Sequence, residues 1–398
     1  MPKKGKPQKQ ETTWANIFTL ILILLVADLA VMFALPLIIP HAGLDYFDFS
    51  YYYTACQNIF SGRLPYINFS FDYPPLALIP MIVAYLPSYL FGVPGLFILC
   101  FSMEMFLCNA GIVTLIYLIA KKVRDDRLAF CASLMYICAI SAQYFLMLRY
   151  DAFPTFLMLL AIWFVMENDR TSGYLTAVFG FLVKLFPCIA IPVFAARSDD
   201  ILLELEEHRN YIVAAAILFL ITVAAFGNEI INYISASLVR NYFVASSFVY
   251  MVSQITGAGL NYTSITFIVL VFALAALVYY ALKIRESKSE LEINTLTLKA
   301  ILAIVVLFSI SQKYISPQYQ IWYVPIICIL LAGDIIGMLL FFAFEVVCYI
   351  EFPLTFGTWY ANTGYLAWEA LPLFLVKYAL MIGIVIYCCV GNAPESKH

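Results

Sequence analysis

Charged residues are scarce in this chain of 398 residues: they make up 12% of it, whereas hydrophobic residues make up 64%. Soluble domains are about half apolar and about a quarter charged, so the composition excludes an ordinary soluble protein. It indicates an all-α, polytopic membrane protein, because lipid leaves backbone polar groups no partner outside a helix. The net charge of -3 says little about partners, and nothing here indicates nucleic-acid binding.

The chain also lacks the usual signs of a metal centre or a disulfide framework. Its three histidines, His41, His208 and His398, lie far apart in the sequence. Nine of its ten cysteines lie in apolar runs, no CxxC pair occurs, and only Cys56 lies in a polar segment. We therefore interpret the cysteines as small packing residues and expect neither a cofactor nor a set of metal ligands.

Four lysines among the first ten residues set the expected orientation. They precede an apolar run, about residues 18–40, that has no small-residue cleavage pattern, so we expect a retained first helix. The positive-inside rule then places residues 1–13, a basic tail, in the cytoplasm and residues 41–75 on the outer face.

Later apolar runs and basic clusters extend this pattern to roughly 12 helical segments, with both termini in the cytoplasm. We expect a single membrane domain over residues 1–398, with residues 128–148 forming one span. Residues 76–91, which contain two prolines, are expected to be re-entrant or interfacial. Residues 173–196 are interrupted near Lys184, which predicts two half-length helices lining a cavity.

The polar, aromatic segment 41–75 is the most informative part of the chain. It places two carboxylates, Asp45 and Asp48, where the chain leaves the first apolar run. Four residues recur at helical spacing: Phe49, Tyr52, Cys56 and Phe60. This pattern predicts an amphipathic helix that lies on the outer surface.

Asp48 has two interpretations at the start of that helix. Aspartate is a common N-cap residue, so its side chain could simply cap the first turn. A carboxylate beside the membrane could instead be a general base that removes a proton from an acceptor hydroxyl. Asp45 is the nearest competitor for that role, and Asp72 is a weaker one.

Three basic residues are candidates for binding a phosphate. Arg149 either forms a structural ion pair with nearby Asp151 or holds a phosphate with its forked donors. Lys184 is the only basic residue expected well within the membrane. Its side chain either extends to the lipid headgroups (snorkelling) or belongs to a functional site. Lys313 lies in a polar strip, residues 312–320, that is denser in polar side chains than loop solvation easily explains.

Three acidic residues, Asp28, Glu104 and Glu345, lie within expected spans. They could form a proton path, although such groups more often pair with a polar neighbour. Transport or flipping of a lipid-linked or small polar solute is therefore an alternative function. It would use acids at the bilayer midplane, whereas an enzyme would use acids in an outer loop.

Six short motifs follow one another along most of the chain: Asp48-Phe-x-x-Tyr-Tyr, Ser61-Gly62-x-x-Pro65-Tyr66, Tyr73-Pro74-Pro75-Leu76, Arg149-x-Asp151-x-x-Pro154, Lys184-x-x-Pro187 and Ser316-Pro317-Gln318-Tyr319-x-x-Trp322-x-x-Pro325. In order and spacing they resemble the polytopic alpha-mannosyltransferase-like family of GT-C glycosyltransferases. The resemblance implies a GT-C fold whose large first outer loop, residues 41–75, carries the catalytic acid. Asp48 matches that acid, although the match could slip to Asp45.

The resemblance also implies a hexosyltransferase whose sugar, expected to be mannose, comes from a polyprenyl-phosphate donor. In an inverting displacement the acid deprotonates the acceptor hydroxyl while a cation stabilises the leaving phosphate. Arg149, Lys184 and Lys313 are the candidates for that cation. The residues expected to line the substrates are Tyr52, Tyr73, Asp151, Gln318, Tyr319 and Trp322.

The expected partners are the lipid-linked donor, membrane lipids, and a glycolipid, glycan or protein acceptor. The expected location is the cell membrane, with the active site on its outer face. The resemblance does not decide whether a divalent metal is required. A noncatalytic subunit of a glycosylation complex would keep the fold without needing an acid at position 48.

Overall fold

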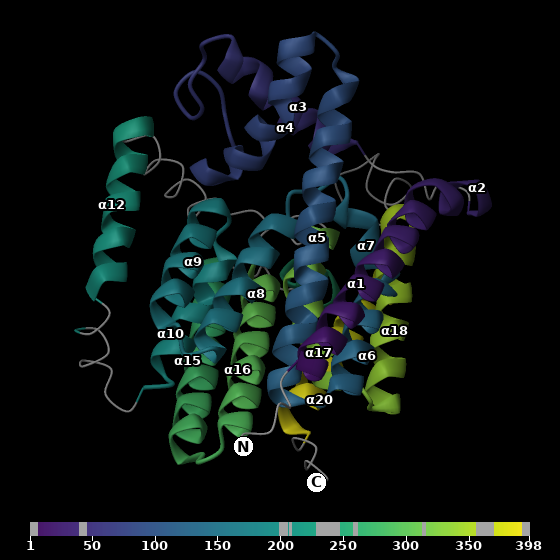
Figure 1. Cartoon of the computed structure of the whole chain (residues 1–398), viewed down its shortest axis with the longest axis vertical. Coiled ribbons are helices and arrows are strands. Elements are labelled where there is room, and N and C mark those ends of the chain that lie inside the picture. Colours follow the sequence, from purple (N-terminus) through teal and green to yellow (C-terminus); the bar gives the residue numbers. More distant parts are fainter. Residues whose placement is uncertain are drawn as a thin grey trace.

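The structure, a computed structural model, describes residues 7–39, 46–198, 206, 209–227, 247–257, 262–312, 316–355 and 370–391. Helices form nearly all of it, and no strand occurs in these ranges (Figure 1). The elements, in chain order, are α1 (Pro7–Leu29), η1 (Ala30–Ala34), α2 (Leu35–Ile38), α3 (Phe47–Phe60), η2 (Pro75–Ala77), α4 (Leu78–Phe91), α5 (Gly95–Val123), α6 (Asp126–Ile137), α7 (Ile140–Leu146), α8 (Ala152–Met166), α9 (Arg170–Val183), η3 (Phe186–Ile189), α10 (Ala190–Ala195), α12 (Arg209–Phe226), α14 (Phe248–Thr256), α15 (Tyr262–Glu286), α16 (Glu290–Ser311), η4 (Pro317–Trp322), α17 (Val324–Leu331), α18 (Ile335–Tyr349), η5 (Ile350–Thr355) and α20 (Leu371–Val390).

The expected all-α, polytopic fold class is confirmed. Among the described residues, six helices are long and apolar enough to cross a membrane, or seven if α6 and α7 count as one bent span. Shorter apolar helices accompany them, among them α8 and the η3–α10 pair. The expectation of a multi-pass membrane protein with half-length helices therefore holds.

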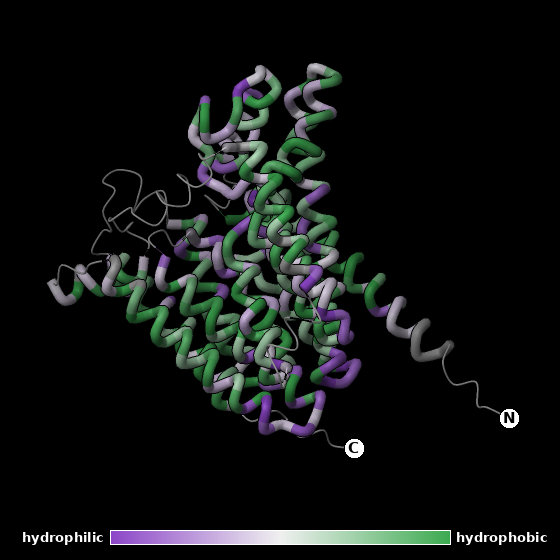
Figure 2. The backbone as a smooth tube through the Cα atoms, turned by 90° about the vertical axis from the view of Figure 1, so that its left-hand side faces the viewer, coloured by the Kyte–Doolittle hydropathy of each residue, from purple (hydrophilic) through white to green (hydrophobic). Residues whose placement is uncertain are grey.

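The molecule has an apolar middle and a polar lower end. Figure 2 shows a mainly hydrophobic tube in the middle, hydrophilic turns at the lower end, and a mixture of both kinds of residue at the upper end. α3 and α4 lie together at the upper end of Figure 1, and α5 runs from there towards the lower end. With 29 residues, α5 is about 44 Å long at about 1.5 Å per residue. The lower end, where α5 finishes and α15 turns into α16, carries Lys121, Lys122, Arg124, Lys283 and Arg285, and we refer to it as the basic end.

Residues 128–148 do not form the single straight span expected from the sequence. α6 ends at Ile137, α7 starts at Ile140, and the two helices are bent by 67°. The carboxylate of Glu345, on α18, accepts the backbone N–H groups of Ser141 and Ala142 at 3.0 and 3.2 Å. It thereby satisfies donors that a new helix start leaves without partners, which stabilises the bend.

The interruption expected near Lys184 is confirmed. α9 ends at Val183, Lys184 has extended backbone angles, and a 3-10 turn starts at Phe186. Gly180 permits the close return of the chain, because a Cβ there would lie 2.7 Å from Cβ of Pro187. The break exposes Lys184 at a helix end, where its side chain is free to turn away from α9.

The amphipathic helix expected in segment 41–75 is confirmed as α3. Its residues Phe49, Tyr52 and Cys56 are buried, and the ring of Phe49 lies 4.8 Å from that of Phe97 on α5. Tyr46 occupies the N-cap position, so the interpretation of Asp48 as the N-cap residue is wrong. Asp48 is the second residue of the helix, and its carboxylate is available for contacts elsewhere.

Candidate functional site

The carboxylate of Asp48 contacts two residues that are distant in the sequence. Nη1 of Arg149, in the turn between α7 and α8, lies 3.1 Å from Oδ2 of Asp48 and forms an ion pair with it. Nε2 of Gln318, on η4, donates a hydrogen bond to the same oxygen at 3.3 Å. The side chain of Asp48 is 19% exposed, whereas that of Arg149 is 5% exposed. Arg149 and Gln318 thus orient a carboxylate that solvent can still reach.

A second ion pair joins Asp151 and Lys184. Nζ of Lys184 lies 2.5 Å from Oδ1 of Asp151, and Nε1 of Trp322 donates to the same oxygen at 2.8 Å. Asp151 is fully buried, and the Lys184 side chain is 12% exposed. Lys184 therefore turns inward to a buried carboxylate, which contradicts the snorkelling interpretation.

Four aromatic rings surround the ammonium group of Lys184. Its Nζ lies 4.8 Å from the ring centre of Tyr150 and 5.2 Å from those of Tyr319 and Trp322, with Tyr73 at 5.9 Å. The rings of Tyr319 and Trp322 are stacked at 4.0 Å. The negative ring faces stabilise the cation by about 0.5–2 kcal/mol for each good contact. These four rings and Asp151 hold the positive charge of Lys184 in place.

Tyrosine side chains connect the two ion pairs. The ring of Tyr150 lies 5.8 Å from that of Tyr52 and 4.8 Å from that of Tyr73. Burial raises the pKa of both Tyr52 and Tyr73 well above the ordinary value, and the negative charge of Asp48 raises them further. Both phenols therefore stay protonated, and a protonated phenol can donate a hydrogen bond.

The structure brings most of the residues predicted for the site together. Asp48, Arg149 and Lys184 meet there with the residues predicted to line the substrates: Tyr52, Tyr73, Asp151, Gln318, Tyr319 and Trp322. Of the alternatives, Asp45 and Lys313 lie outside the described residues, so neither is placed. The roles assigned to all these residues stay predictions.

Two residues of the site were missed by sequence reasoning. Tyr150 contacts Lys184 and links the tyrosines, and the ring of Phe186 stacks on Trp322 at 4.4 Å. Both lie inside motifs that had been recognised: Tyr150 directly follows Arg149, and Phe186 is two residues after Lys184. An aromatic residue beside a candidate cation was the signal that could have identified them.

The acids within candidate spans have different environments. Asp28 is buried beside Asn109, whereas Glu345 caps the backbone of α7. No group of three or more His, Cys, Asp or Glu side chains placed to hold a metal ion occurs in the part of the chain that the structure describes. The candidate site is therefore a pair of carboxylate–cation contacts lined by aromatic rings.

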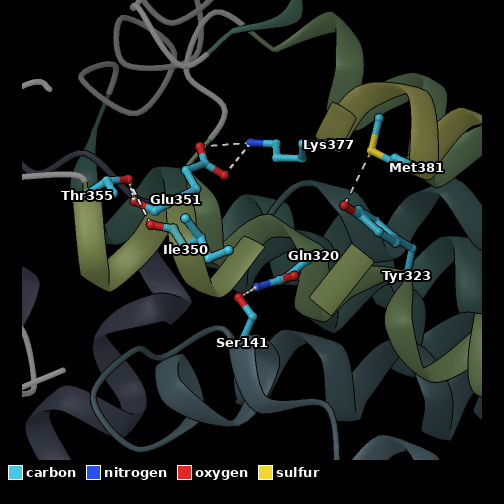
Figure 3. A network of polar contacts seen from close by, with 8 residues as sticks. All are labelled: Ser141, Gln320, Tyr323, Ile350, Glu351, Thr355, Lys377 and Met381. Carbon is cyan, nitrogen blue, oxygen red and sulfur yellow. Dashed lines mark hydrogen bonds and ion pairs between the residues drawn. The ribbon is translucent and has the colours of Figure 1, made fainter. Parts of the chain in front are cut away.

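The expectation that Lys184 is the only basic residue buried within the membrane is wrong. Lys299 on α16 and Lys377 on α20 are also buried, and both belong to candidate spans. Nζ of Lys377 lies 2.9 and 2.7 Å from the two carboxylate oxygens of Glu351, and Figure 3 shows the two side chains pointing towards each other. This pair lines a small cavity together with Tyr319 and Gln320 of η4. Because Lys377 lies in an otherwise apolar helix and its charge is neutralised by Glu351, hydropathy alone does not identify it as a buried cation.

No protein-family model matches this chain, and no curated protein matches its sequence. Among solved structures, the chain is similar to the crystal structure of the Archaeoglobus fulgidus oligosaccharyltransferase tethered with an acceptor peptide containing the NVT sequon via a disulfide bond. The sequence identity is 11% and the TM-score is 0.45, with 96% of this chain and 56% of that chain covered. This chain thus spans little more than half of that structure. The likeness alone assigns neither a family nor an activity to the chain.

Proposed function

We propose that this chain is a membrane glycosyltransferase of the GT-C type. It transfers a hexose, with mannose the expected sugar, from a polyprenyl-phosphate donor to a hydroxyl of a glycolipid, glycan or protein. The observation that carries the proposal is that η4 contacts both carboxylates: Gln318 binds Asp48, and Trp322 binds Asp151. A potential base and a caged cation are therefore held by one short element.

In the proposed reaction, Asp48 accepts the proton of the acceptor hydroxyl as its oxygen attacks the anomeric carbon. The bond from that carbon to the phosphate oxygen breaks, and the polyprenyl phosphate leaves with the electron pair, so the configuration inverts. A carboxylate must be partly exposed to meet an acceptor, as Asp48 is. Arg149 and Gln318 fix its orientation, which lowers the cost of reaching the reactive geometry.

Lys184 is the proposed partner of the donor phosphate. Charge grows on the phosphate as the bond breaks, and a preplaced cation stabilises that charge without reorganising. The pair with Asp151 and the four rings preorganise Lys184 in this way. The aromatic rings also offer faces on which a sugar ring can stack. We propose that this site faces the outer side of the cell membrane and that both termini are cytoplasmic.

Transport or flipping of a solute is the second candidate function. The buried carboxylate of Asp28, in the first candidate span, is the observation that favours it. Glu345 does not add to it, because its carboxylate is engaged with the backbone of α7. The clustering of Asp48 with Arg149 and of Lys184 with Asp151 favours the enzyme.

Replacing Asp48 with Asn tests the proposal. Transfer of labelled sugar from a polyprenyl-phosphate donor should fall by about 10²- to 10⁴-fold in membranes that contain Asp48→Asn. Asp126→Asn is the matched control, since Asp126 also lies in the first turn of a helix and pairs with a cation, Lys121, at 2.7 Å. That control should keep its activity.

Three outcomes separate the competing accounts. Full activity of Asp48→Asn, with loss in Asp45→Asn, would move the base to Asp45. Full activity of both variants would contradict the proposal that either aspartate acts as the general base. Loss of solute uptake in Asp28→Asn, with no sugar transfer by the unaltered protein, would favour transport.

A further inference from the structure

A cavity of about 380 Å³ lies at the basic end, away from α3 and the candidate site. It is formed where α5 ends, where α17 turns into α18, and where α16 and the end of α20 pass beside that turn. These elements include four candidate membrane spans. The cavity therefore lies at the depth where helix ends leave the apolar middle of the molecule.

Two cationic side chains line this cavity. Nη2 of Arg124 donates a hydrogen bond to the carbonyl oxygen of Leu330 at 2.5 Å. Lys299 is 7% exposed, and its Nζ donates to the carbonyl oxygen of Gly391 at 2.6 Å. Burial lowers the pKa of Arg124, which reflects the cost of keeping this cation out of water.

Among the residues that the structure describes, Asp334 is the one carboxylate that lines the cavity, and it is already engaged. Its Oδ1 accepts the backbone N–H groups of Ile336 and Gly337 at the start of α18. Its Oδ2 accepts the hydroxyl of Tyr387 at 2.6 Å. The part of the chain that the structure describes contains no ion pair between Asp334 and either cation.

The described residues that line the cavity thus carry two positive charges and one negative charge. Asp334 and Asp125 attract Arg124 without forming an ion pair with it, and Lys299 is buried. An anion that hydrogen-bonds to both cations would therefore add electrostatic stabilisation. Arginine and lysine donors suit phosphate oxygens in particular. The rest of the lining is largely apolar, with Leu128, Leu330 and Leu331 facing the same space.

We propose that this cavity binds a phosphate group through Arg124 and Lys299. The phosphate of an anionic phospholipid fits this position, because its headgroup would meet the cations while its chains continue along the apolar helices. Free phosphate has the same charged chemistry without the chains. Neither source involves the sugar-transfer site, so this inference is independent of the proposed function.

Binding can be measured on the full-length protein in uncharged detergent. Phosphatidylglycerol, phosphatidylcholine with the same acyl chains, and inorganic phosphate are each titrated, and the thermal unfolding midpoint is followed. We expect phosphatidylglycerol to raise the midpoint in a saturable manner and phosphatidylcholine to have little effect. A similar rise with inorganic phosphate would identify the free anion as sufficient.

Two variants and one control locate the binding. Lys299→Met and Arg124→Gln should each weaken the affinity about tenfold or more, since each removes a charged hydrogen bond. Arg285→Gln removes an exposed charge at the same end outside the cavity and should leave the affinity unchanged. If Lys299→Met does not fold, Lys299→Arg and Arg124→Gln decide between retained and lost binding.

Two results would overturn the proposal. One is the absence of any saturable effect of phosphatidylglycerol or phosphate on the unaltered protein. The other is an equal affinity in Arg124→Gln, Arg285→Gln and the unaltered protein, which would show that the anion binds elsewhere.

Discussion

Two lysine–carboxylate pairs, Lys184–Asp151 and Lys377–Glu351, are built from the same kinds of group but differ in their surroundings. Lys377 contacts both oxygens of Glu351, and their side chains are 7% and 1% exposed. Lys184 contacts one oxygen of Asp151 and is itself 12% exposed. Among the described residues, four aromatic rings surround Lys184 and two lie near Lys377.

The difference suggests a division between fastening and function. The Lys377–Glu351 pair is almost fully buried, and it links α20 to η5, which directly follows α18. The Lys184 side chain is more exposed than that of Lys377, and it lies beside a second pair that contains Asp48. A cation that is preorganised but not fully enclosed can accept a phosphate. Substitutions in the two pairs should therefore affect different quantities.

The largest expected effect is the loss of stability in Lys377→Met. The change leaves the carboxylate of Glu351 buried without its cation, which should lower the free energy of unfolding by about 3–5 kcal/mol. The double variant Lys377→Met/Glu351→Leu removes both charges and should recover most of that loss. Thermal unfolding in detergent measures both. If Lys377→Met were as stable as the unaltered protein, the pair would not contribute to the free energy of unfolding.

The next effect concerns activity. Lys184→Met/Asp151→Leu removes both charges of the site pair, so it should remain folded but transfer sugar about 10²- to 10³-fold more slowly, a barrier increase of about 3–4 kcal/mol. Lys377→Met/Glu351→Leu is the matched control and should transfer sugar at close to the normal rate per folded molecule. Equal losses in the two double variants would abolish the distinction between the pairs.

The smallest effect is expected from a substitution at Gly180, which packs against Pro187 beside the segment that carries Lys184. In Gly180→Ala the new methyl group meets Pro187, and in Gly111→Ala it meets the ring of Phe156 at 2.6 Å. Both changes overpack helices and should cost about 1–3 kcal/mol of stability. Only Gly180→Ala displaces the segment that carries Lys184, so only it should lower the transfer rate per folded molecule, by severalfold. The comparison fails if Gly111→Ala lowers the rate equally.

Much of the helical layout could be predicted because apolar runs end at polar residues. The helix expected in segment 41–75 and the interruption expected near Lys184 coincide with α3 and with the end of α9. The bend between α6 and α7 could not be predicted in this way. It depends on Glu345, whose carboxylate meets a backbone N–H group 204 residues away in the sequence. Hydropathy reports local composition and carries no information about such a contact.

The site shows the same limit. Its motifs indicated Asp48, Arg149, Lys184 and the η4 residues, because polar and charged groups are conspicuous in an apolar chain. Their pairing could not be read from spacing: Gln318 is 270 residues from Asp48. The burial of Lys377 could not be predicted either. Its charge is paired with the carboxylate of Glu351, and the helix that contains it is apolar overall.

The most direct test of the central claim is an experimental structure of the full chain in lipid nanodiscs with a phosphonate analogue of a polyprenyl-phosphate hexose. The account predicts density for the phosphonate within hydrogen-bond distance of Lys184 or Arg149, with the sugar beside Asp48. Density for the phosphonate only in the cavity at the basic end, or the sugar away from Asp48, would contradict it.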